Sequence, residues 1–100
     1  MKVVNLEIAK KLKRRGFAQS QTEKMYQKRN NCTVYDLKES HKNAFVAYDA
    51  PNLIELDKIA ESLGIALHFV EITDVNEYAE KLISLLKKYK MNLSDVKIMK

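Results

Sequence analysis

The segment AFVAYDAPNLIELDKIAESLGIALHFVEI, residues 44–72, decides the fold. Two apolar runs rich in strand-forming residues, 44–48 and 65–72, flank a segment whose apolar residues recur at helical spacing. The longer run is apolar on both alternating faces, which indicates a strand that is covered on both sides. Because a helix of this length most easily joins parallel strands, the segment predicts a β-α-β unit with a right-handed crossover.

The helix inside this unit is expected to span residues 51–63. Pro51 suits the first helical turn, where its missing N–H is not needed, and Gly64 suits the left-handed position just past the helix end. The face turned to solvent is expected to carry four charged residues, namely Glu55, Asp57, Lys58 and Glu61.

Two further helices are expected near the ends of the chain. Asn5 can cap a helix over 6–15 that Gly16 ends. Asp74 can cap a long helix over 75–90, which has the strongest helical periodicity in the sequence. This last helix has more apolar positions than a small sheet needs, so we expect it to carry a self-association face.

Residues 20–30 leave two alternatives open. Ser20 and Glu23 fit a capping box, which would begin a helix running through Arg29. The other alternative is a hairpin with its turn at residues 29–31, because asparagine tolerates the left-handed backbone of tight turns.

Together these segments predict one α/β (α+β) domain over residues 1–100. Its sheet of three to four strands would contain the β-α-β unit of residues 44–72 and a strand over 32–37. In that added strand, Val34 and Cys32 are expected to face inward. The three helices, over residues 6–15, 51–63 and 75–90, would pack on the sheet.

The composition limits the class of protein. With 100 residues and 46% hydrophobic content, the chain can form a single small core. Its one cysteine, Cys32, allows no intrachain disulfide, which is typical of a reducing compartment. No apolar run is long enough to span a bilayer. We therefore expect a cytoplasmic protein with no membrane association, no cofactor and no small-molecule ligand.

The net charge of +5 is concentrated at one end of the chain. Residues 1–35 carry nine Lys and Arg against two Glu, whereas the remainder has a net charge of −2. A basic first third favours an anionic partner. The residues that would bind nucleic acid are Lys10, Lys11, Arg14, Arg15, Lys28 and Arg29. Equally open is a structural interpretation, in which the basic residues form a solvated helix face. Part of the cluster has a structural reason, because Lys13, Arg14 and Arg15 fall in the last turn of the first helix and complement its dipole.

Few residues suggest chemistry. Asp49 and Asp74 follow the two expected parallel strands and could together bind magnesium, but helix capping is the preferred interpretation. No residue is assigned to catalysis or to a metal. Three tyrosines, Tyr26, Tyr35 and Tyr48, could stack on nucleobases if they shared a sheet face with basic residues, although ordinary packing is preferred.

Two resemblances add to these observations. The segment IAKKLKRRGF at residues 8–17, with Tyr48-Asp49-Ala50-Pro51 and Leu63-Gly64-Ile65, resembles small uncharacterised proteins of phages and prophages of gut bacteria. That resemblance covers about half the chain and implies an α/β fold and a cytoplasmic accessory role in a mobile element. Residues 8–23 are also similar to the start of helix-turn-helix proteins, but the segment that follows lacks the apolar positions of a recognition helix.

The leading hypothesis is a non-enzymatic small binding or accessory protein of mobile-element type, which acts through contact with a protein partner or with itself. The alternative is a nucleic-acid-binding protein that uses the basic first third of the chain. A metal-dependent enzyme centred on Asp49 and Asp74 is the third hypothesis.

Overall fold

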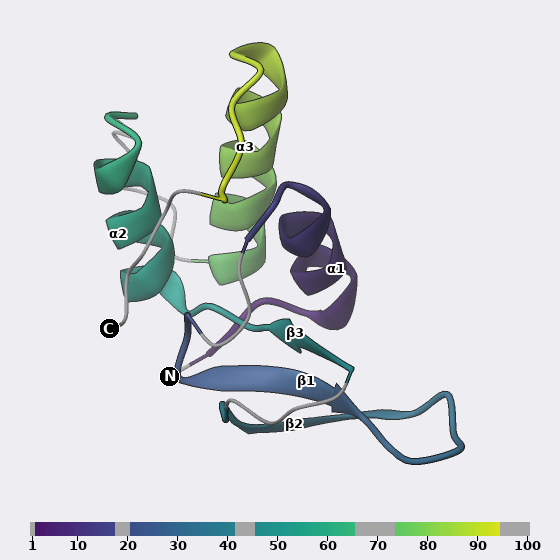
Figure 1. Ribbon diagram of the computed structural model, residues 1–100. Coiled ribbons are helices and arrows are strands. Elements are labelled where there is room, and N and C mark those ends of the chain that lie inside the picture. Colours follow the sequence, from purple (N-terminus) through teal and green to yellow (C-terminus); the bar gives the residue numbers. More distant parts are fainter. Residues whose placement is uncertain (1, 18–20, 42–45, 66–73, 95–100) are drawn as a thin grey trace.

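The protein has a small α+β fold, in which the described residues form three helices and a three-stranded antiparallel sheet (Figure 1). The computed structural model describes residues 2–17, 21–41, 46–65 and 74–94. The elements in chain order are α1 (Leu6–Arg14), β1 (Lys24–Lys28), β2 (Tyr35–Glu39), β3 (Ala47–Asp49), α2 (Leu53–Ser62) and α3 (Val75–Lys88).

The sheet has the order β2-β1-β3, and β1 is antiparallel to both neighbours. Of the parallel β-α-β unit predicted from the sequence, the described residues contain only the first half, which is β3 followed by α2. Its second strand, predicted over residues 65–72, lies outside the described residues except for Ile65. An isolated antiparallel bridge between Val3 and Asn52 joins the start of the chain to the segment after β3.

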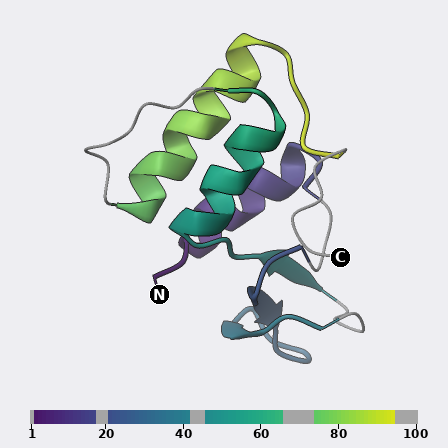
Figure 2. The same ribbon diagram turned by 90° about the vertical axis from the view of Figure 1, so that its left-hand side faces the viewer.

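The helices lie together on one side of the sheet, as the two perpendicular views show (Figures 1 and 2). Helix α1 contacts β3, and α3 packs against both α1 and α2. The Tyr26 hydroxyl of the central strand donates to the Val4 carbonyl at 2.7 Å, which ties the sheet to the segment before α1. The main core is formed by apolar residues of the three helices and the segments beside them, among them Val4, Leu12, Phe17, Leu56, Ile59, Leu82 and Leu93.

The hairpin alternative for residues 20–30 is confirmed, and the helix alternative is wrong. Strands β1 and β2 pair in register around a turn in which Asn31 has a φ of 56°. The second strand begins at Tyr35 rather than at Cys32. Val34 does not face inward as predicted but is 44% exposed, and Cys32 lies half-buried in the turn region.

The predicted helix ends are largely confirmed. The Asn5 side chain accepts from the Ile8 N–H at 3.0 Å and caps α1, and Asp74 caps α3 by accepting from the Glu77 N–H at 3.0 Å. Gly16, with a φ of 91°, closes α1 in a Schellman motif, in which Phe17 N–H donates to the Leu12 carbonyl at 3.2 Å.

Helix α2 differs from the prediction at its start. It begins at Leu53, with Asn52 as its cap, so Pro51 precedes the helix instead of occupying its first turn. Glu55 was expected on the solvent face but is only 7% exposed. Its carboxylate accepts from the backbone N–H groups of Asn52 and Glu23, each at 2.9 Å. Burial of Glu55 is therefore matched by hydrogen bonds that also connect α2 to the start of β1.

The apolar stripe of α3 is used inside the molecule. Six of its residues are buried, namely Val75, Tyr78, Ala79, Leu82, Ile83 and Leu86. These residues pack on α1 and α2, whereas Leu85 is half-buried and Tyr89, just after the helix, is 57% exposed. The self-association face expected on this helix stays a prediction. None of the helices in the described ranges combines the length and the apolar character that crossing a bilayer needs.

Tyr78 gives the fold a dependence on alkaline pH. Its hydroxyl donates to Asp57 Oδ1 at 2.8 Å, and burial, together with this hydrogen bond and the Asp57 charge, raises the pKa of Tyr78 well above its ordinary value. A raised phenol pKa contributes stability that is present below about pH 10 and is lost as pH rises further.

We expect the melting temperature to fall above about pH 10. Tyr78→Phe should flatten that fall, whereas Tyr89→Phe, at a 57% exposed position, should leave it unchanged. A parallel fall in both variants would contradict this role of Tyr78.

Candidate nucleic-acid interface

Three tyrosines and a leucine share the helix side of the sheet. Tyr26 is directly opposite both Leu37 and Tyr48, and residues paired in this way point to the same face. Tyr35 lies two residues before Leu37 and therefore also points to this face. The rings of Tyr35 and Tyr48 are 5.8 Å apart between centroids, at an interplanar angle of 43°. Tyr26, Tyr35 and Tyr48 therefore lie on one face of the sheet.

Basic side chains of α1 lie over these rings. Lys10 Nζ is 5.4 Å from the centroid of the Tyr35 ring and 6.0 Å from that of Tyr48. Lys13 Nζ is 4.9 Å from the Tyr48 centroid and donates to the Ala47 carbonyl at 3.1 Å. Arg14, with Lys10, Lys13 and Tyr48, lines an open hollow of about 350 Å³. The three cations cluster because positions three and four apart are neighbours on a helix surface.

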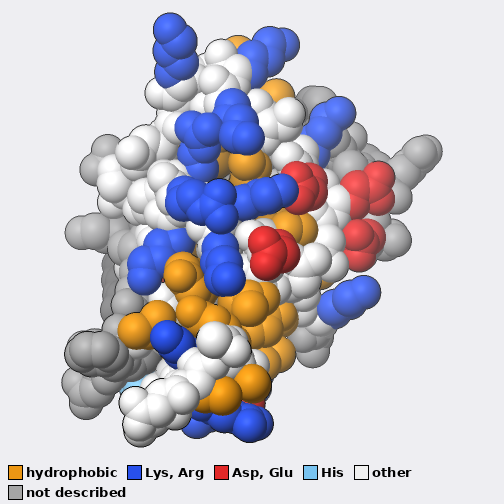
Figure 3. Space-filling model, turned by 90° about the vertical axis from the view of Figure 1, so that its right-hand side faces the viewer, with side chains coloured by type: hydrophobic (Ala, Val, Ile, Leu, Met, Phe, Trp, Pro, Cys, Tyr) orange, Lys and Arg blue, Asp and Glu red, His pale blue; other side chains and the backbone are white. Residues whose placement is uncertain are grey.

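We call this surface the α1–tyrosine face and define it as Lys10, Lys13, Arg14, Tyr35 and Tyr48. On this side of the molecule, Lys and Arg side chains gather above a group of hydrophobic side chains (Figure 3). Among the described residues, no Asp or Glu forms an ion pair with its three cations. The face therefore places three cations that form no ion pair with a described acid next to two aromatic rings.

The four predicted binding residues of α1 have different environments. Lys10 and Arg14 belong to the α1–tyrosine face. Lys11 instead forms an ion pair with Glu80 of α3 at 3.0 Å. Arg15 is the C-cap residue of α1, and its carbonyl accepts from the Leu93 N–H at 2.7 Å.

Sequence reasoning left Lys13 out of the predicted set. It was assigned only to the helix dipole, although its position three residues after Lys10 places both on one side of α1. The helical spacing alone could have identified it.

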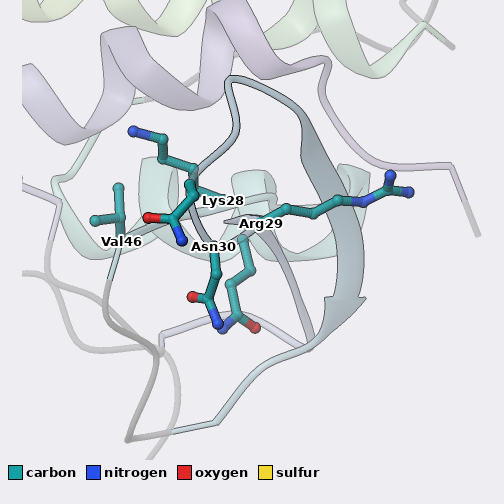
Figure 4. Close-up of a pocket in the computed structure, with 6 residues that line it drawn as sticks. Lys28, Arg29, Asn30 and Val46 are labelled. Carbon is teal, nitrogen blue, oxygen red and sulfur yellow. The ribbon is translucent and has the colours of Figure 1, made fainter.

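The two predicted residues of the hairpin, Lys28 and Arg29, line a second hollow of about 340 Å³ beside Val46. Their side chains extend in opposite directions, as neighbours on a strand do (Figure 4). Lys28 is opposite Tyr35 in the sheet and so lies on the same face as the tyrosines. Arg29 donates to both carboxylate oxygens of Asp36, at 2.8 and 2.9 Å, which lowers the pKa of Asp36. Lys28 can therefore extend the α1–tyrosine face, whereas Arg29 is already engaged.

The two acids of the metal hypothesis have structural partners. Asp49 at the end of β3 is buried and accepts from the Gln21 N–H at 2.6 Å, and Asp74 caps α3 and lies 3.8 Å from Lys2 Nζ. In the described part of the chain, no three His, Cys, Asp or Glu side chains lie close enough to hold a metal ion together. The α1–tyrosine face is the better-supported candidate site.

Comparisons with protein-family models, curated proteins and solved structures found no match to this chain. The resemblance to phage-borne proteins therefore remains a prediction.

Proposed function

We propose that this protein is a non-enzymatic binding protein whose ligand is single-stranded nucleic acid, bound on the α1–tyrosine face. One observation carries the proposal: the cations of Lys10, Lys13 and Arg14, none of them in an ion pair with a described acid, lie beside the rings of Tyr35 and Tyr48. Proteins that bind single strands combine these two elements, a positive groove for phosphates and aromatic rings for bases.

A nucleobase stacked on a tyrosine ring of this face should be more favourable than the lysine ammonium group that lies over the ring. A cation–π contact at an exposed site contributes about 0.5–1 kcal/mol, whereas stacking of a base on an aromatic side chain contributes about 1–3 kcal/mol. When a base stacks on Tyr48, Lys13 can move from the ring to a phosphate. The released ammonium then gains a charge partner, so the exchange is favourable for both groups.

The ligand is a single strand because its bases must be free to stack. In a duplex the base faces are already stacked on each other, and only phosphates would reach the face. Duplex DNA should therefore bind more weakly than a single strand of the same length.

The proposal is tested by fluorescence anisotropy with labelled oligothymidine over a range of salt concentrations. We expect Lys13→Gln/Arg14→Gln to weaken binding at low salt by about tenfold or more and to reduce the slope of log K against log salt by about 1.4, the value for two lost phosphate contacts. The matched control is Lys58→Gln/Lys81→Gln, which removes the same charge from exposed positions on α2 and α3.

Two results would overturn the proposal. One is the absence of any anisotropy change for the unmodified protein at low salt. The other is an equal loss of affinity in the two double variants, because this would show that net charge alone drives binding.

A protein contact is the second candidate function, and it was the leading hypothesis from the sequence. The observation that favours it is on β2, where Leu37 is 48% exposed and the preceding Val34 is 44% exposed. Large apolar side chains beside a sheet edge are typical of a surface that pairs with another chain.

A further inference from the structure

Strand β2 forms an edge of the sheet described here. Its only strand neighbour in the described ranges is β1, on one side. The strand reads YDLKE from Tyr35 to Glu39, with the exposed Leu37 at its centre and opposite charges at Asp36 and Lys38 on either side of it. An edge of this kind can accept a further strand.

The hydrogen bonds at the two ends of the hairpin fix which backbone groups of β2 point outward. Arg29 N–H donates to the Val34 carbonyl at 2.9 Å, and Ser40 N–H donates to the Glu23 carbonyl at 2.9 Å. In an antiparallel ladder the residues that bond to a given neighbour alternate, so the even-numbered residues from 34 to 40 face β1. The N–H and C=O groups of Tyr35, Leu37 and Glu39 therefore point away from β1, toward the outer edge.

We propose that a second copy of this chain pairs with β2 through its own β2, antiparallel and centred on Leu37. The arrangement has a two-fold axis between the two Leu37 residues. Each Leu37 offers its outward N–H and C=O to the other, and each Tyr35 does the same with Glu39 of the second copy. The two sheets become one continuous six-stranded sheet. This inference deepens the second candidate function by naming the partner, and it does not depend on nucleic-acid binding.

The charges select this register. Centred on Leu37, the pairing sets Asp36 of each copy opposite Lys38 of the other, so that two attractive pairs form. A pairing centred on Asp36 or on Lys38 would instead set like charges directly opposite each other, which is unfavourable. Asp36 and Lys38 lie on the sheet face away from the helices, and Arg29 holds the Asp36 carboxylate in place through two hydrogen bonds. The charged residues of this edge thus favour one partner, a second copy, in one register.

A cysteine cross-link tests the geometry in the full chain. Opposed residues in a hydrogen-bonded antiparallel pair have their Cα atoms about 5.5 Å apart, a distance that a disulfide can span. In a Cys32→Ser background, we expect Leu37→Cys to form a disulfide-linked dimer under mild oxidation about tenfold faster than Ile54→Cys. Ile54 is the matched control because it is 53% exposed and lies on α2. Equal rates for the two cysteines would overturn the proposal.

A charge exchange tests the register and does not depend on the cross-link. Lys38→Asp and Asp36→Lys should each be monomeric by analytical ultracentrifugation at a concentration where the unmodified chain is dimeric. An equimolar mixture of the two variants should recover a heterodimer, because every opposed pair in it is again attractive. Failure of the mixture to associate, with both variants folded by circular dichroism, would contradict the Leu37-centred pairing. Oligothymidine binding that persists in both variants would show that nucleic-acid binding does not require this dimer.

Discussion

Replacement of Glu55 by alanine should lower the free energy of unfolding by about 2–4 kcal/mol, since one buried and one partly buried backbone donor lose a charged acceptor. The Glu55 carboxylate accepts from the Asn52 and Glu23 N–H groups, each at 2.9 Å, and the side chain is 7% exposed. Alanine leaves both donors without this acceptor. Because Glu23 precedes β1, the change weakens the attachment of the sheet to α2 as well as the capping box of the helix.

Urea unfolding followed by circular dichroism measures this effect, with Glu61→Ala as the control. Glu61 is an exposed residue of the same helix, so its replacement removes the same charge and should change stability by no more than about 0.5 kcal/mol. If the two variants unfold at the same urea concentration, the hydrogen bonds of Glu55 contribute nothing net to the fold.

Replacement of Gly16 by alanine should lower the free energy of unfolding by about 2–4 kcal/mol. Two causes add up, namely the left-handed backbone conformation of this residue and the crowding of the new Cβ against its neighbours. Gly16 has a φ of 91°, and a Cβ on it would lie 2.5 Å from Asn92 Oδ1 and 3.2 Å from the Ser94 backbone nitrogen. The segment after α3 therefore packs directly on the end of α1, where the Leu93 N–H also bonds to the Arg15 carbonyl.

Gly64→Ala is the matched control for this prediction. Gly64 has a φ of 69°, but no described atom lies within 4 Å of the position that its Cβ would take. Thermal unfolding should thus show a loss of only about 1 kcal/mol for Gly64→Ala, the part due to backbone conformation. Addition of Asn92→Ala to Gly16→Ala should recover part of the larger loss. Equal losses in the free energy of unfolding at the two glycines would show that crowding against Asn92 does not contribute to the effect.

Local signals in the sequence predicted all three helices, although the start of α2 was placed at Pro51 and not at Leu53. Each helix begins with a capping side chain, and the left-handed residue after α1 and after α2 is a glycine. The third helix end shows the limit of such signals. There Lys90 takes the left-handed position with a φ of 53°, and its sequence gives no indication of this role.

Two predictions were wrong because the surroundings of the residue in the fold outweighed its own preference. Glu55 was placed on the solvent face because its charge favours water, but two backbone donors, one of them 32 residues away, hold it in the interior. Val34 was expected inside because it is apolar and β-branched, yet it falls at the turn before β2 starts. A contact with a distant part of the chain decides the place of Glu55, whereas the local turn of the hairpin decides that of Val34.

The candidate site could be predicted only in part, because it too depends on contacts that the sequence does not show. The sequence shows where cations are, but it does not show which of them meet an acid in space. Lys11 and Arg29 are paired with Glu80 and Asp36, respectively, and only the fold reveals these partners. The tyrosines could not be placed beside α1 from the sequence, because a one-residue shift of register would turn them to the opposite face.

An NMR titration of the labelled protein with a short oligothymidine locates binding residue by residue. We expect the largest shifts in the ring protons of Tyr35 and Tyr48 and in the amides of Lys10, Lys13 and Arg14, with helix α2 unaffected. Ring shifts toward lower frequency would identify stacked bases, because an aromatic base shields protons that lie over its face. Shifts confined to α2, or no shifts at saturating oligothymidine and low salt, would contradict binding on the α1–tyrosine face.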